Sequence, residues 1–213
     1  MLSLVRIAFF CLTIIFLINT TAFANRDVDA INKTFKTCRK ALLERDGGTI
    51  WEMLDNQTRE YYESAINFAL TIKKKDLDKL DMNTKLLVLS LRNEFKKSQL
   101  TSLKGKDIFN KWINQGQISK SLLAGIEKLY KVKLNGKLAQ GYVNKDPNMP
   151  VFYFAKEGRH WKFALVESIK RASAAHEQMI KQSGLTEAEY IEFAVRTMAQ
   201  VGFDKRTYDG PIN

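Results

Sequence analysis

The chain has 213 residues, of which 45% are apolar and 27% charged, a balance typical of a globular protein and not of a disordered one. This length suffices for one sizeable domain with its own core. The formal net charge of +11 invites a nucleic-acid hypothesis, but the lysines are scattered over most segments, so no nucleic-acid partner is expected. Beyond the first two dozen residues, no stretch approaches the roughly 20 apolar residues of a membrane-spanning helix.

Residues 1–24 have the pattern of a secretory signal peptide. Arg6 is their only charge, residues 7–18 are an apolar run, and Ala22 and Ala24 frame an A-x-A cleavage site. We therefore expect a periplasmic or secreted protein, cleaved near Ala24, with an uncleaved anchor as the alternative. Cleavage removes Cys11 and leaves Cys38 without a partner for an internal disulfide. Burial of Cys38 in a helix is the expectation, and an intermolecular bridge is the alternative.

The mature chain is predicted to open with a helix, because apolar residues recur at spacings of three and four: Val28, Ile31, Phe35, Cys38 and Leu42. Glycine in residues 46–48 is expected to end this helix in the left-handed conformation. Thr49 and Glu52 have the spacing of a capping box, which predicts a short second helix carrying Trp51 and Leu54.

Three more helices are predicted over residues 61–72, 86–95 and 103–114. Asp55 precedes the first of them as a helix cap, because a short acidic side chain can accept from the free amides of the first turn. The charged residues 73–82 are expected to link two helices, and Gly116 to end the last of the three. The first half of the chain is therefore predicted to be helical with short turns.

The apolar period changes from helical to strand-like after residue 121. Strands are predicted over residues 126–134, 138–143, 151–155 and 160–166. Asn135 and Gly136 are the expected hairpin turn, because both tolerate positive φ. A looser turn is expected at residues 146–148, and a third at residues 156–159.

The fourth predicted strand contains the sequence HWKFAL, in which Trp161, Phe163 and Leu165 alternate with His160, Lys162 and Ala164. Successive side chains of a strand point to opposite faces. The aromatic face is therefore expected to be buried against the helices. The face that carries the lysine is expected to be solvated, with His160 as a partly exposed neighbour of the turn.

Helices return after residue 167. One is predicted to bury the stripe Ile169, Ala172, His176, Met179 and Ile180. Gly184 breaks it, and Thr186 with Glu189 has capping-box form. The final helix carries the stripe Ala188, Ile191, Val195 and Met198, and the tail over residues 202–213 is expected to fray. The fold class is thus α+β: N-terminal helices packed on a curved antiparallel sheet of about four strands, followed by C-terminal helices.

Three stretches carry a resemblance to a known superfamily: ALLERDGGTIWEMLDNQTREYY (residues 41–62), LKGKDIFNKW (103–112), and the pair KVKLNGKLAQGYV and FYFAKEGRHWKFAL (131–143 and 152–165). They resemble extracytoplasmic members of the nuclear transport factor two-like superfamily, also described as a cystatin-like cone. The resemblance implies a sheet that wraps the helices around an apolar cavity. It assigns residues 25–168 to this domain and residues 169–213 to a C-terminal helical extension and tail.

The resemblance also implies the residues of a ligand site. The cavity would be lined by Trp51, Leu54, Tyr62, Phe154, Trp161 and Phe163. Whether these residues leave a cavity or fill a core is open at this point. The expected function is an exported, non-enzymatic protein that binds a hydrophobic small molecule or lipid.

Two further functions are retained. The stripe of the final helix could pack back on the body or dock on a protein partner or a second copy of the chain. Enzymes of this superfamily, such as isomerases and dehydratases, use an aspartate or histidine with tyrosines inside the cone, which implies Asp55 and Tyr62 here. No predicted strand carries a central aspartate, so no catalytic residue is assigned. No cofactor is expected, and no metal, because His160, His176 and the cysteine have no ligand spacing.

Overall fold

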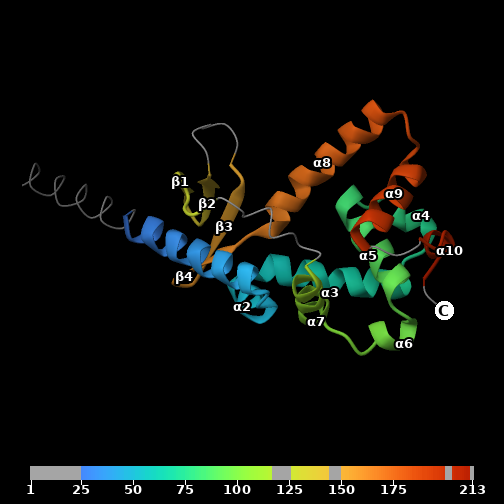
Figure 1. The fold of residues 1–213 in the computed structure, drawn as a ribbon, viewed down its shortest axis with the longest axis horizontal. Coiled ribbons are helices and arrows are strands. Elements are labelled where there is room, and N and C mark those ends of the chain that lie inside the picture. Colours follow the sequence, from blue (N-terminus) through green and yellow to red (C-terminus); the bar gives the residue numbers. More distant parts are fainter. Residues whose placement is uncertain (1–24, 117–125, 144–149, 200–202, 212–213) are drawn as a thin grey trace, which may run out of the picture.

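A computed structural model describes residues 25–116, 126–143, 150–199 and 203–211 (Figure 1). It confirms the α+β class, with helices before and after a four-stranded antiparallel sheet. The expected signal peptide and the turn at residues 146–148 lie outside the described residues. None of the described helices is long and apolar enough to cross a membrane.

The elements follow one another in this order: a helix over residues 25–44, α2 (Gly47–Met53), α3 (Asn56–Thr71), α4 (Lys74–Leu77), α5 (Met82–Glu94), α6 (Lys97–Leu100), α7 (Gly105–Gln115), β1 (Lys131–Asn135), β2 (Leu138–Tyr142), β3 (Phe152–Glu157), β4 (His160–Phe163), α8 (Leu165–Ser183), α9 (Glu187–Ala199) and α10 (Arg206–Asp209). The helix over residues 25–44 lies beside the sheet in Figure 1, and α4, α5, α9 and α10 gather at the other end of the molecule. α8 runs between these two ends.

The junction between the first helix and α2 differs from the prediction. Arg45, and not a glycine, takes the left-handed conformation, with φ of 59°. Asp46 is the N-cap of α2, and its carboxylate accepts from the backbone N–H of Thr49 at 2.9 Å. The predicted glycine cap and the Thr49–Glu52 capping box are therefore wrong. Gly47 and Gly48 open the next helix instead.

The reason for Gly47 is the contact between α2 and α7. A Cβ atom on Gly47 would lie 2.8 Å from the Cα of Asn110, whereas one on Gly48 would meet only the Asp46 carboxylate at 3.5 Å. The close approach allows Trp51 to contact Phe109, with ring centroids 5.6 Å apart. A contact between residues so far apart in sequence leaves no local signal.

The cap at Asp55 is confirmed. Its carboxylate accepts from the backbone N–H of Thr58 at 3.0 Å and begins α3. The backbone N–H of Asp55 donates to the carbonyl of Phe163 at 2.9 Å, which fixes the start of α3 against β4. The region that was expected to be a charged link, residues 73–82, contains the short helix α4.

The sheet has the order β1-β2-β3-β4 with antiparallel neighbours. Its first turn falls one residue later than predicted, and the turn between β3 and β4, at residues 158–159, lies within the predicted range. Asn135 pairs with Leu138, so the first hairpin turns at Gly136 and Lys137, and only Gly136 of these has positive φ, at 60°. The tight hairpin therefore needs one residue with positive φ, and the predicted role for Asn135 is wrong.

The aromatic face of the sheet is buried as predicted. Trp161, Phe163 and Phe154 have between 0% and 6% of their surface exposed. The helix over residues 25–44 covers this face: the Thr34 hydroxyl donates to the carbonyl of Trp161, and the indole N–H of Trp161 donates to Asp27, both at 2.9 Å. His160 is exposed at the start of β4, also as predicted. Leu165 belongs to α8 and not to the strand.

The stripe predicted for α8 is wrong in part. Ala172 and Met179 are exposed, and the buried residues of α8 are Val166 and Ser173. The Ser173 hydroxyl donates to Asp81 at 2.6 Å, so α5 packs against a face of α8 that includes a polar residue. A pattern that counts only apolar residues misses such a face. α8 also runs through residue 168, the expected end of the N-terminal domain.

The final helix packs back on the body. Ile191 and Val195 of α9 are fully buried, and α9 contacts α5. The capping box at its start is confirmed, because the Thr186 backbone N–H donates to Glu189 at 2.8 Å and the Thr186 hydroxyl accepts from the Glu189 backbone N–H at 3.3 Å. Ala188, however, is exposed, and the Met198 side chain lies outside the described part of the chain.

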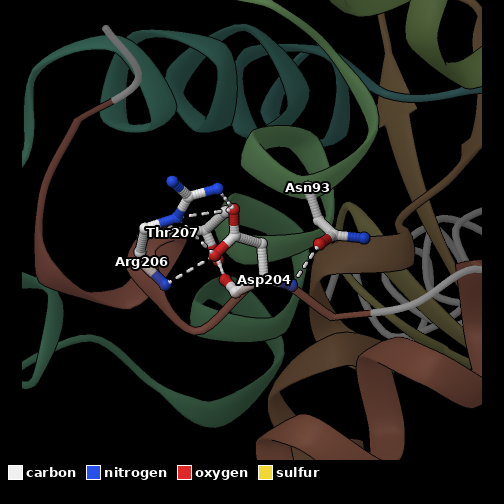
Figure 2. Close-up of polar contacts among 4 residues, drawn as sticks. All are labelled: Asn93, Asp204, Arg206 and Thr207. Atoms are coloured by element: carbon white, nitrogen blue, oxygen red, sulfur yellow. Dashed lines mark hydrogen bonds and ion pairs between the residues drawn. The ribbon is translucent and has the colours of Figure 1, made fainter.

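The tail does not fray over residues 203–211. Figure 2 shows the Asp204 backbone N–H donating to the side chain of Asn93 on α5, at 2.9 Å. Arg206 pairs with Asp204 at 2.7 Å. The guanidinium of Arg92, on α5, donates to the carbonyl of Thr207 at 3.0 Å and to that of Ala69 at 3.0 Å. Arg92 thus joins the tail to the end of α3, a link between distant segments that sequence periodicity does not show.

The α2–α7 contact predicts opposite effects for two adjacent glycines. Gly47→Ala should lower the free energy of unfolding by about 1–3 kcal/mol, because its Cβ overlaps the Asn110 backbone. Gly48→Ala should raise it by up to about 1 kcal/mol, because alanine favours the helix and its Cβ meets only the Asp46 carboxylate, at an ordinary van der Waals distance of 3.5 Å. Urea denaturation of both variants checks this. Equal effects of the two substitutions would contradict the close approach.

Candidate functional site

The six residues predicted to line an apolar cavity are all buried: Trp51, Leu54, Tyr62, Phe154, Trp161 and Phe163. They contact other core side chains. The rings of Phe154 and Phe163 lie 4.6 Å apart, and those of Trp51 and Tyr62 lie 6.2 Å apart. Leu54 forms a bridge with Phe163. These contacts join the helices to the sheet and make the six residues parts of one hydrophobic core.

Asp55 and Tyr62 have roles in the fold: Asp55 caps α3, and Tyr62 packs in the core. The Asp55 carboxylate is engaged as the cap of α3, and burial raises its pKa against the opposing hydrogen bonds from Thr58. Burial also raises the pKa of Tyr62 above its ordinary value. The Tyr62 ring contacts Trp51 and Phe109 among others. Within the described residues no hydrogen bond joins Asp55 to Tyr62.

The cysteine and the histidines do not form a reactive cluster. Cys38 is a buried free thiol, as expected, and burial raises its pKa to about 12 despite the opposing charge of Lys162. His176 contacts the Tyr190 hydroxyl, and burial lowers its pKa. No group of three or more His, Cys, Asp or Glu side chains that could hold a metal ion occurs in the described ranges.

A pocket of about 500 Å³ lies on the opposite face of the sheet, between β1, β2 and β3 and the first turns of α8. In Figure 1 α8 leaves the sheet directly after β4. The pocket is lined by Lys133, Leu134, Asn135, Leu138, Ala139, Gln140, Tyr153, Phe154, Ala164, Glu167 and Arg171. Only Phe154 belongs also to the six residues expected to line a cavity.

The strand register builds the floor of this pocket. Lys133, Gln140 and Tyr153 are directly paired across the three strands, so their side chains form one row on the same face. Glu167 and Arg171 are one turn apart on α8 and form the wall. The backbone N–H of Ala164 donates to the Tyr153 carbonyl at 2.9 Å and sets the distance between floor and wall.

Tyr153 is the least satisfied polar group of the pocket. It is 8% exposed, and its hydroxyl is buried without a hydrogen-bond partner in the described part of the chain. The Arg171 guanidinium lies over its ring, 5.1 Å from the centroid. Burial raises the pKa of Tyr153 in spite of the nearby Arg171 charge, so the hydroxyl keeps its proton at neutral pH.

Sequence reasoning missed this pocket because it treated the lysine-bearing face of the sheet as solvated. The alternating polar positions Lys133, Gln140 and Tyr153 were visible in the strands. What the sequence did not show is that the first turns of α8 lie beside that face, in contact with β3. The spacing of four between Glu167 and Arg171 on the next helix is the one signal that could have suggested a second polar wall.

Comparisons with known proteins identify no relative. No family model matches the chain, and neither curated proteins nor solved structures give a match. The geometry of the chain itself is therefore the basis on which its function is inferred.

The unpaired hydroxyl predicts opposite effects for two tyrosines of the sheet. Tyr153→Phe should leave the free energy of unfolding unchanged or raise it by up to about 1 kcal/mol, because a buried group without a partner is removed. Tyr142→Phe is the matched control. The Tyr142 hydroxyl donates to Gln140 at 3.0 Å, so its removal should cost about 0.5–1.5 kcal/mol. Denaturant titration that finds Tyr153→Phe the more destabilising of the two would refute the assignment.

Proposed function

We propose that this chain is an exported, non-enzymatic binding protein that takes a small organic molecule in the pocket between the sheet and α8. The pocket itself is the observation that carries the proposal. Its volume of about 500 Å³ is within the roughly 300–1,000 Å³ that small-molecule sites commonly have. Aliphatic side chains and polar ones share the lining, which suits a ligand with an apolar body and a polar end.

This proposal moves the ligand away from the expected aromatic cavity. The six residues expected to line that cavity belong to the hydrophobic core cluster, whereas the new pocket has lysine, arginine, glutamate and carboxamide groups around its apolar part. A long lipid chain would leave these polar groups without partners, and burying them unpaired costs free energy. The mixed lining therefore favours a small amphipathic molecule over a lipid.

The two other functions have less support. An interaction module based on the last helix needs a free apolar stripe, but Ile191 and Val195 are buried against the body. An enzyme based on Asp55 and Tyr62 needs a free carboxylate, but Asp55 is engaged as a helix cap. Binding in the pocket requires no such rearrangement.

Export rests on the pattern of residues 1–24. N-terminal sequencing of protein recovered outside the cytoplasm should give Asn25 as the first residue. An intact start at Met1 in all fractions would contradict cleavage. Membership of the nuclear transport factor two-like superfamily stays a prediction, carried by the three stretches that resemble it.

An NMR screen of the isotope-labelled protein tests pocket binding. We expect compounds from a library of organic acids, amines and neutral aromatics to shift the backbone amides of Leu138, Ala139 and Ala164. Gln140→Trp, which fills the floor of the pocket, should abolish these shifts. Lys131→Trp, exposed on the same strand pair and outside the lining, should preserve them. Absence of binders from every class, or binding that survives Gln140→Trp, would overturn the proposal.

A further inference from the structure

The pocket is lined by two cations that have no carboxylate partner among the described residues. Lys133 comes from β1 and Arg171 from α8, so they reach the pocket from its floor and its wall. No ion pair joins either of them to another residue within the described ranges. The lone carboxylate of the lining, that of Glu167, is paired with Lys170 at 2.8 Å.

We propose that the pocket selects an organic anion with a single carboxylate, which Arg171 and Lys133 bind while its apolar body lies against Leu138. This inference depends on the proposed binding function and adds the chemical class of the ligand. Two cations and one carboxylate give the lining a net charge of +1, which one bound carboxylate neutralises.

Arg171 is already oriented for such a ligand. Its guanidinium lies over the Tyr153 ring, 5.1 Å from the centroid, and this cation–π contact restricts the side chain before a ligand arrives. A planar guanidinium donates two parallel hydrogen bonds to a carboxylate, so an ordered arginine loses little freedom on binding. Arg171 therefore determines where the charged end of the ligand lies.

Tyr153 supplies the third group. Its hydroxyl is protonated, buried and without a partner in the described part of the chain, and it belongs to the residue over whose ring Arg171 lies. A carboxylate oxygen drawn to Arg171 gives this hydroxyl the acceptor that it lacks. A buried donor without an acceptor is costly, and a bound carboxylate removes that cost. The hydroxyl gives up no earlier hydrogen bond when it donates to the ligand.

A phosphate monoester shares the anionic chemistry but fits less well. It carries a charge of about −1.5 to −2 at pH 7, more than the net charge of the lining. The excess would face Glu167, whose carboxylate is part of the same wall. We therefore assign a carboxylate, and Glu167 acts as the group that discriminates against phosphate.

Matched probes test the inference in the full protein. 4-Phenylbutyrate and 4-phenylbutyramide share one body and differ in charge, and 2-phenylethyl phosphate supplies the alternative anion. NMR titration at the amides of Ala139 and Ala164 should give at least tenfold tighter binding for the carboxylate than for either other probe. Added NaCl should weaken the binding of 4-phenylbutyrate and leave the binding of 4-phenylbutyramide unchanged.

Variants assign the selectivity to its residues. Arg171→Gln and Lys133→Gln should each lower the affinity for 4-phenylbutyrate at least fivefold without changing the affinity for 4-phenylbutyramide. Tyr153→Phe should lower the affinity for 4-phenylbutyrate about threefold. Lys131→Gln removes a charge from the same strand outside the pocket and should change the affinity less than twofold. Glu167→Gln should improve binding of 2-phenylethyl phosphate more than that of the carboxylate.

Two results would overturn the inference in distinguishable ways. Equal binding of the carboxylate and the amide, insensitive to Arg171→Gln, would disprove anion selection and leave pocket binding standing. Failure of all three probes, together with failure of the wider screen to shift the pocket amides, would remove both the ligand class and the proposed function. Preference for phosphate over carboxylate in the unchanged protein would contradict the role of Glu167.

Discussion

The segment from Phe163 to Leu165 holds the sheet and the helices together. The carbonyl of Phe163 accepts from the backbone N–H of Asp55, and the backbone N–H of Leu165 donates to the Thr58 hydroxyl at 3.0 Å. Both bonds reach the first turn of α3. Between them, Ala164 donates to the Tyr153 carbonyl. Three consecutive residues thus fix β4 against α3, fix β3 beside it, and set the direction in which α8 leaves.

This junction determines what each face of the sheet can do. One face presents Phe154, Trp161 and Phe163 to the N-terminal helices and packs with their side chains in one hydrophobic core. The other face is covered only in part, because α8 leaves directly after the junction and contacts the sheet at β3. The pocket lies between this face and the first turns of α8. A core and a binding site therefore arise from the same hairpin, with the core on the side where helices pack fully.

Features set by nearby residues could be predicted from the sequence, and features set by distant contacts could not. The burial of Phe35, Trp161 and Phe163 follows from the period of apolar residues, and the cap at Asp55 follows from the chemistry of its own turn. The contact at Gly47 depends on Asn110, and the ordered tail depends on Arg92 and Asn93.

The pocket belongs to the second kind of feature. Lys133 and Arg171 are indistinguishable from ordinary solvated residues until the path of α8 is known. They line one pocket because the junction at residues 163–165 places the first turns of α8 beside β3. The sequence around this junction contains no motif that predicts the path of α8. The predicted aromatic residues were correctly placed inside the protein, and the candidate site lies on the face that the pattern marked as polar.

Hydrogen exchange of single backbone amides measures the junction directly. The amides of Asp55, Ala164 and Leu165 should exchange only through global unfolding, since each donates to a group on another element. Their protection should match that of central amides in α3 and α5. Exchange of these three amides as fast as in exposed turns, with α3 and α5 still protected, would show that the sheet is not held at this junction and that the pocket has no fixed wall.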